Sequence, residues 1–333
     1  MPYTLFQGGR RRRRRTRRVL PAVLLLAAVA AAAFLVVRGG SGFDEPREVA
    51  ASAPAAPLVD AAPVPLPGGG TAPTPLGVRL SQGGDAVSVR FKRAPRAALL
   101  FDLDTGEVLW RRNPTRPLPI ASLTKMMTAL VAADRIPEGA RIRITRQALA
   151  YRGSAVGVLP LGKRVGVNAL MHGLLLPSGN DAARALAAHA ASSLPKFIGL
   201  MNRRATQMGL TCTRFTSVDG FRNRGNHSCA ADLAAIGRAV LREPRLARVT
   251  RRRQAVLPFP IKGGKLYLYN NNPLLRQGYR GATGLKTGYT VAAGRCLVAT
   301  ARRGNIRLGV VLLDSPDPGR QAMQLLDRGF RAA

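Results

Sequence analysis

The chain has 333 residues, with 52 lysines and arginines against 17 aspartates and glutamates, a formal net charge of +35 at pH 7. Such a charge suits nucleic acid, but aromatic residues make up only 5% of the chain and no nucleic-acid-binding motif occurs, so we expect no nucleic-acid partner. Attraction to another anionic polymer would use the same charge without reading bases.

The N-terminal segment has the pattern of a membrane anchor. The basic residues 1–18 precede nineteen uncharged and mostly apolar residues, 19–37. As a helix, these nineteen would span about 28 Å, close to the hydrocarbon core of a bilayer, and they exceed the apolar core of a secretory signal. We predict a single transmembrane helix at 19–37 in the cell membrane, with 1–18 in the cytoplasm and the rest of the chain outside the cell.

A long tether follows the predicted anchor. Residues 38–86 are rich in proline, alanine and glycine and contain few aromatic residues. Such a sequence buries too little apolar surface to fold, so we predict a disordered linker. The folded domain is predicted at 87–333.

Strand patterns occur toward both ends of this domain, and helical patterns lie between them. Two apolar runs within 97–113 flank Asp104-Thr105-Gly106, a sequence typical of a hairpin. Helical periodicity follows in the middle of the domain and returns at its end. Helices are predicted from near Ser122 and at 167–176, 180–191, 193–209, 230–242 and 318–330.

Strand patterns return before the last helix. We predict a strand at 284–290 and a hairpin within 296–314 that turns at Gly304. Strands at both ends with helices between them indicate an α/β (α+β) domain, with one antiparallel sheet and an inserted helical lobe.

Ser122 and Lys125 are the first candidate catalytic residues. They lie three apart, so their side chains share a face of a helix, beside an apolar stripe that would partly bury the lysine. Burial and a second nearby cation would lower the pKa of such a lysine, so that it could deprotonate the serine. The stripe comprises Leu123, Met126, Met127, Leu130 and Val131.

A helix-capping serine with an exposed lysine would show the same spacing. Ser193 and Lys196 have that spacing too, and Pro195 between them predicts an ordinary helix start. The spacing alone therefore leaves both interpretations of Ser122 open.

Ser178 and Asn180 form a second polar pair, on the loop between two predicted helices. The serine would relay a proton, and the amide would bind a substrate carbonyl or hold Lys125. The alternative is a loop in which Asn180 or Asp181 caps the following helix.

The third motif is GLKTGYT, at 284–290. Lys286 would be the second cation that Lys125 needs, and Thr287 would offer its hydroxyl to a substrate carboxylate. Gly288 would let a substrate backbone approach the strand, because it has no Cβ. The backbone amide of Tyr289 would stabilise an oxyanion together with that of Ser122.

The three cysteines show no zinc-site spacing, and we expect neither a metal nor a cofactor. Outside the cytoplasm cysteines can pair, and Cys212 and Cys229 enclose a short loop-like sequence, so we predict a disulfide between them. Cys296 has the pattern of a buried strand residue.

The three motifs in this order, within 94–330, resemble those of the D-alanyl-D-alanine carboxypeptidases, which are low-molecular-mass serine penicillin-binding proteins. The resemblance implies a β-lactamase/transpeptidase-like fold with a five-stranded antiparallel sheet flanked by helices. It also implies peptidoglycan stem peptides as substrates and β-lactam antibiotics as inhibitors.

The resemblance assigns a role to each motif. Ser122 would attack the peptide bond between the last two D-alanines and Lys125 would take its proton. Ser178 would pass a proton to the leaving amine, and Asn180 would orient the substrate. Lys286 and Thr287 would hold the terminal carboxylate.

Related activities remain as alternatives: D,D-endopeptidase or transpeptidase, β-lactamase, or a non-catalytic wall-binding homologue. A class A β-lactamase needs a glutamate that activates water soon after the second motif. The sequence has no glutamate between Glu138 and Glu243, which argues against that route.

Overall fold

The computed structural model describes residues 76–80, 85–221 and 224–333. The predicted cytoplasmic segment and the predicted membrane span at 19–37 lie outside these residues. In the part of the chain that is described, no helix has the length and apolar character needed to cross a membrane.

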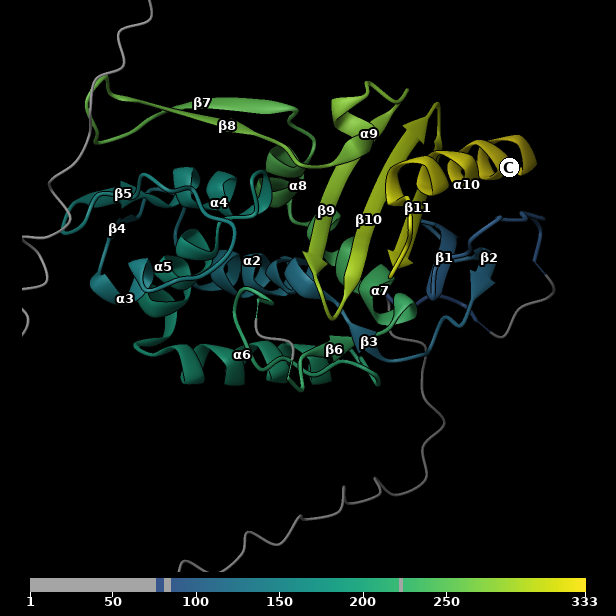
Figure 1. Ribbon diagram of the computed structural model, residues 1–333, viewed down its shortest axis with the longest axis horizontal. Helices are drawn as coiled ribbons and strands as arrows, with labels where there is room; N and C mark the ends of the chain where they lie inside the picture. Colours follow the sequence, from purple (N-terminus) through teal and green to yellow (C-terminus); the bar gives the residue numbers. More distant parts are fainter. Residues whose placement is uncertain (1–75, 81–84, 222–223) are drawn as a thin grey trace, which may run out of the picture. The chain divides into compact units, whose positions relative to one another are not determined.

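A five-stranded antiparallel sheet, in the order β2-β1-β11-β10-β9, is built from the two ends of the domain (Figure 1). The N-terminal hairpin supplies β1 (Ala97–Asp102) and β2 (Val108–Arg112). The C-terminal part supplies β9 (Ala282–Thr290), β10 (Gly294–Arg303) and β11 (Ile306–Leu313). The predicted sheet is confirmed, and β9 lies at one of its edges.

Each face of the sheet packs against helices, because successive strand residues point to opposite sides. Leu100 on β1 belongs to the cluster that includes α10 (Pro318–Ala332), and its neighbour Leu99 belongs to the cluster that includes α7 (Ala230–Arg242). All four central apolar positions of β1 are fully buried.

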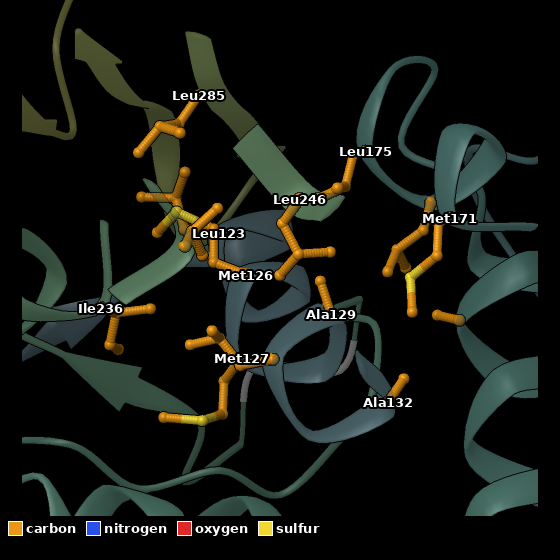
Figure 2. Close-up of a cluster of buried hydrophobic side chains, with 14 of the residues drawn as sticks. Leu123, Met126, Met127, Ala129, Ala132, Met171, Leu175, Ile236, Leu246 and Leu285 are labelled. Carbon is orange, nitrogen blue, oxygen red and sulfur yellow. The ribbon is translucent and has the colours of Figure 1, made fainter. Parts of the chain in front are cut away.

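The helical lobe is inserted between β2 and β9, as predicted. Its central helix is α2, which begins at Thr124 and is buried over its first nine residues. Figure 2 shows Met126 and Met127 of α2 among side chains from other elements, including Leu246 and Leu285. The helices of the lobe are α2 (Thr124–Arg135), α3 (Arg146–Leu149), α4 (Val167–Leu175), α5 (Asn180–Ala191), α6 (Leu194–Gln207) and α8 (Pro244–Thr250).

Short two-stranded sheets complete the domain. The hairpin β7–β8 and the brief α9 lead from α8 into β9. The pairs are β3 (Leu118–Pro119) with β6 (His227–Ser228), β4 (Arg141–Arg143) with β5 (Arg164–Gly166), and β7 (Gln254–Pro258) with β8 (Lys265–Tyr269), and α9 is Pro273–Arg276.

Residues 76–80, within the predicted linker 38–86, include backbone that the folded domain binds. The buried guanidinium of Arg238 donates to the carbonyl oxygens of Leu76 and Gly77, at 2.9 and 2.7 Å. A buried arginine needs such acceptors, because an unpaired buried charge is costly. Local composition cannot reveal that a residue far along the chain will bind this backbone.

Candidate active site

Ser122 lies in a 3-10 turn, η1 (Ala121–Leu123), which directly precedes α2. The prediction of one continuous helix through Ser122 is therefore refined, because α2 begins two residues later. The turn still places the two candidate side chains together: Lys125 Nζ donates to Ser122 Oγ at 2.7 Å.

Lys125 is fully buried beneath the serine, with 0% of its surface exposed. Its Nζ has a second acceptor, the backbone oxygen of Asp219, at 2.7 Å. Burial lowers the pKa of Lys125 from 10.5 to about 7, against the opposing charges of Asp219 and Asp181. A lysine with this pKa is partly neutral at pH 7 and able to accept a proton.

Lys286 projects from β9 into the same buried region and is 1% exposed. Burial lowers the pKa of Lys286 well below its usual value, and the charge of Lys125 lowers it further as the smaller cause. Its Nζ donates to the backbone oxygen of Thr287 at 2.9 Å. The charge of Lys125 thus acts on the pKa of Lys286, whereas burial is what lowers the pKa of Lys125.

Gly288 lies against the turn that carries the serine. A Cβ at this position would be 2.9 Å from the backbone oxygen of Ile120 and 3.1 Å from the backbone nitrogen of Ser122. Sequence reasoning attributed the glycine to the approach of a substrate backbone. In the structure, the close approach of β9 to the serine turn itself requires it.

Ser178 and Asn180 place polar atoms in the site that no protein group satisfies. Ser178 Oγ and Asn180 Oδ1 are buried, and neither has a hydrogen-bond partner. The residue that caps α5 is Gly179, without a side-chain bond, so Asn180 is not the helix cap. Buried polar atoms without partners are costly in a folded protein, which indicates that a ligand or water completes them.

A cleft of about 810 Å³ opens above these groups. It contains six of the eight predicted catalytic and substrate-binding residues, whereas Lys125 and Lys286 lie buried below it. The six are Ser122, Ser178, Asn180, Thr287, Gly288 and Tyr289.

Sequence reasoning missed Arg295, which also lines the cleft. Arg295 on β10 pairs with Tyr289 on β9, so it lies on the same face of the sheet as Tyr289 and Thr287. Among the described residues that line the cleft, it is the one lysine or arginine. In a chain with 52 such residues, nothing in the sequence singles it out.

The loop between Cys212 and Cys229 forms part of the site. The structure joins the two cysteines, with Cα atoms 5.8 Å apart, while Cys296 is free and buried in β10. The side chain of Thr128 on α2 donates to the backbone oxygen of Val218 at 2.6 Å, which holds the loop on the helix. The loop can therefore present the Asp219 oxygen to Lys125.

Comparisons with known proteins indicate the same family as the three motifs. The D-alanyl-D-alanine carboxypeptidase family, peptidase S11, matches residues 86–317. Escherichia coli D-alanyl-D-alanine carboxypeptidase DacC is 37% identical over 250 residues, which cover 71% of this chain and 61% of DacC. Mycobacterium tuberculosis DacB2, which has the same description, is 37% identical over 70% of this chain and 81% of its own length.

The fold has close matches among solved structures as well. The Streptomyces K15 DD-transpeptidase has a TM-score of 0.68 and 30% identity, covering 73% of this chain and 100% of that one. The chain therefore belongs to the D-alanyl-D-alanine carboxypeptidase family and has the transpeptidase-like fold expected from its motifs. It spans about three fifths of the length of DacC, at 61%.

Proposed function

We propose that this protein is a serine-type D-Ala-D-Ala carboxypeptidase that trims peptidoglycan stem peptides through an acyl-enzyme on Ser122. One observation carries the proposal: Ser122 Oγ lies at the floor of a cleft, 2.7 Å from a buried amine. Burial lowers the pKa of that amine, on Lys125, to about 7. A hydroxyl beside such a base is the arrangement that activates a nucleophile at neutral pH.

In the first step, Lys125 Nζ takes the proton of Ser122 Oγ as the oxygen bonds to the carbonyl carbon between the last two D-alanines. The backbone amides of Ser122 and Tyr289 stabilise the negative charge on the carbonyl oxygen. Tyr289 lies on β9, the edge strand beside the cleft, which supports this role.

The bond to the leaving D-alanine then breaks, and its amine receives a proton through Ser178. The unpartnered Oγ of Ser178 supports this role, and the free Oδ1 of Asn180 suits an amide of the substrate. We assign the terminal carboxylate to Thr287 and Arg295, which line the cleft. Lys286 does not line the cleft. In this proposal Lys286 therefore affects the carboxylate only indirectly, through Thr287 and β9.

Water finally attacks the ester on Ser122 and releases the shortened peptide. β-Lactams would acylate the same hydroxyl and leave slowly. Asp317 supplies the one carboxylate among the described cleft residues, and its Oδ1 already accepts the backbone N–H of Arg320 at 3.1 Å. No glutamate there is available to activate water in the manner of a class A β-lactamase.

Transpeptidation is the second candidate, because an amine acceptor can replace water in the last step. The related Streptomyces K15 protein, described as a DD-transpeptidase, favours testing it. Either acceptor attacks the same acyl-enzyme, so the ratio of products decides between them.

We also propose that residues 19–37 anchor the enzyme in the cell membrane, with the catalytic domain outside the cell. The proposal rests on the arginine-rich flank and the apolar length of this segment. Peptidoglycan lies on that side of the membrane, so the substrate and the orientation agree.

The test is incubation of the purified protein with a muropeptide that ends in D-Ala-D-Ala, followed by measurement of free D-alanine. We expect D-alanine in the wild type and none with Ser122→Ala. Adding an amine acceptor would divert product into a cross-linked peptide if the protein is a transpeptidase. Absence of D-alanine and of any β-lactam adduct would refute the proposal.

A further inference from the structure

A hollow of about 340 Å³ is lined by residues of α4, α8 and β7 and of the loops that follow α2 and α8. None of its lining residues also lines the catalytic cleft. Four exposed residues form its rim, so it opens to solvent: Glu138, Asn168, Arg248 and Arg252. Three buried residues form its floor, namely His172, Arg245 and Val249.

The hollow carries a surplus of positive charge. Arg245, Arg248 and Arg252 contribute guanidinium groups, and Glu138 contributes the one carboxylate among the described lining residues. That carboxylate uses a single oxygen, Oε1, for Arg248 at 2.9 Å and for Arg245 at 3.8 Å. Among the described residues, no carboxylate lies within 4.0 Å of the Arg252 guanidinium. An anion that enters the hollow therefore meets net positive charge.

Two nitrogen atoms of the floor have no hydrogen-bond partner among the described residues. Arg245 Nη1 donates to the backbone oxygen of Ile136 at 2.8 Å, whereas Arg245 Nη2 has no acceptor. His172 Nδ1 lies 2.8 Å from the backbone oxygen of Asn168 and carries the proton, because a carbonyl oxygen only accepts. His172 Nε2 is then left unpaired. Buried polar atoms without partners are costly, which indicates that a ligand or water completes them.

We propose that this hollow binds a phosphate ester. The oxygens of a tetrahedral phosphate accept from several directions, which suits donors on Arg245, Arg252 and protonated His172. A water molecule takes up about 30 Å³ in the liquid, so the hollow has room for the phosphate and for part of the molecule that carries it. Val249 and Leu257 offer apolar surface to the carbon atoms next to the phosphate. This site is independent of the proposed catalytic function.

Phosphate binding should be linked to protonation of His172. Burial, and to a smaller extent the charge of Arg252, hold the pKa of His172 below its usual value, so the ring is neutral at pH 7. Glu138 and the three arginines are the other charged groups that line the hollow. A phosphate beside the ring favours its charged form, in which Nε2 gains a proton to donate.

The test follows the imidazole signals of the full-length protein by NMR, in neutral detergent at pH 7 and constant ionic strength. The chain has three histidines, so each ring can be assigned. With inorganic phosphate and with glycerol 3-phosphate, the His172 Nε2 signal should move toward that of a protonated nitrogen and saturate. The signals of His189 and His227, which lie outside the hollow, should stay in place. Acetate should leave the His172 signal unchanged.

A matched pair of variants tests the charge. Arg252 and Arg253 are adjacent and exposed, but Arg253 does not line the hollow. Arg252→Gln should weaken phosphate binding about fivefold, the upper end for one exposed ion pair, and Arg253→Gln should keep the wild-type affinity. Neither residue lines the catalytic cleft, so both variants should keep penicillin labelling.

A third ligand, monomeric dihexanoylphosphatidylglycerol, distinguishes the sources of the phosphate. Tighter binding than that of glycerol 3-phosphate would assign a lipid headgroup, and equal or weaker binding would assign a water-soluble phosphate ester. Three results would overturn the inference: no response of His172 to any phosphate compound, an equal response to acetate, or equal phosphate affinity in Arg252→Gln and Arg253→Gln. Release of D-alanine in the same preparation would leave the proposed function intact.

Discussion

Two turns of this protein carry the same spacing of serine and lysine and have different surroundings. Lys125 is fully buried, with its Nζ 2.7 Å from Ser122 Oγ. Ser193 instead caps α6, and its Oγ accepts the backbone N–H of Lys196 at 3.3 Å, while the Lys196 side chain is exposed. The comparison teaches that burial, not spacing, gives a lysine the pKa of a base.

The most severe test of this contrast is removal of each hydroxyl. We expect Ser122→Ala to abolish covalent labelling by fluorescent penicillin, because no other group forms the ester. Ser193→Ala should leave labelling intact and cost about 1 kcal/mol of unfolding free energy, the usual value of a helix cap. Gel fluorescence and denaturant unfolding measure the two effects. Labelling that survives in Ser122→Ala would reject the assigned nucleophile.

Removal of each amine is the next test. Lys125→Met should lower the second-order rate constant of penicillin acylation by about 10²–10⁴-fold, the typical contribution of a general base. Lys196→Met should not change it, because that side chain faces solvent. Stopped-flow acylation measures the rate, and a thermal melt checks that Lys125→Met remains folded. Equal rates for the two variants would contradict the distinction between the turns.

The pH dependence of the acylation rate tests whether Lys125 is the base. Because burial lowers the pKa of Lys125 to about 7, the acylation rate should fall about tenfold per unit below pH 7 and be level above it. The carboxylate of Asp219 raises this pKa, so Asp219→Asn should move the acid limb to lower pH. A limb that moves to higher pH would contradict the assigned base.

The lowered pKa of Lys125 also makes the free energy of unfolding depend on pH. Between pH 7 and 10.5 the unfolded chain binds a proton on Lys125 that the folded chain lacks. The free energy of unfolding should therefore rise with pH over this range, and the rise should be weaker in Lys125→Met. Denaturant unfolding at several pH values measures this difference.

The last prediction concerns the loop between Cys212 and Cys229, whose Asp219 oxygen accepts Lys125 Nζ and Ser122 Oγ. Cys212→Ser/Cys229→Ser should lower the free energy of unfolding by about 3 kcal/mol, because the unfolded chain loses a cross-link over 17 residues. Acylation should also slow, since this loop carries the Asp219 oxygen that Lys125 contacts. Reductant should change the wild type but not the variant. Free thiols at both positions in non-reducing mass mapping would reject the bridge.

Much of the fold followed from local patterns. The hairpin at 97–113, the helices at 180–191 and 230–242 and the final hairpin are present with bounds within a few residues of those predicted. These segments have strong periodicity and clear turn residues, which act over a few positions in the chain. Where the backbone is held by a side chain far along the chain, as at Leu76 and Gly77, no local pattern predicts the contact.

The residues of the candidate site also separate into those that local patterns predict and those that they do not. The residue types and the order of the motifs predicted the candidate site. The structure brings six of the eight predicted residues to one cleft. The Asp219 oxygen is a backbone atom, so the identity of its residue says nothing about its role. Arg295 and Phe221 reach the cleft through strand pairing and a loop, and neither position stands out in a basic, apolar sequence.

Local sequence patterns predict which side chains can react and, to within a few residues, where the strongly periodic helices and strands lie. Long-range packing decides which of the two identical serine–lysine spacings holds a reactive lysine. The reason is physical: the pKa of an amine depends on the water it loses and on the charges beside it, and both come from segments far away in the chain.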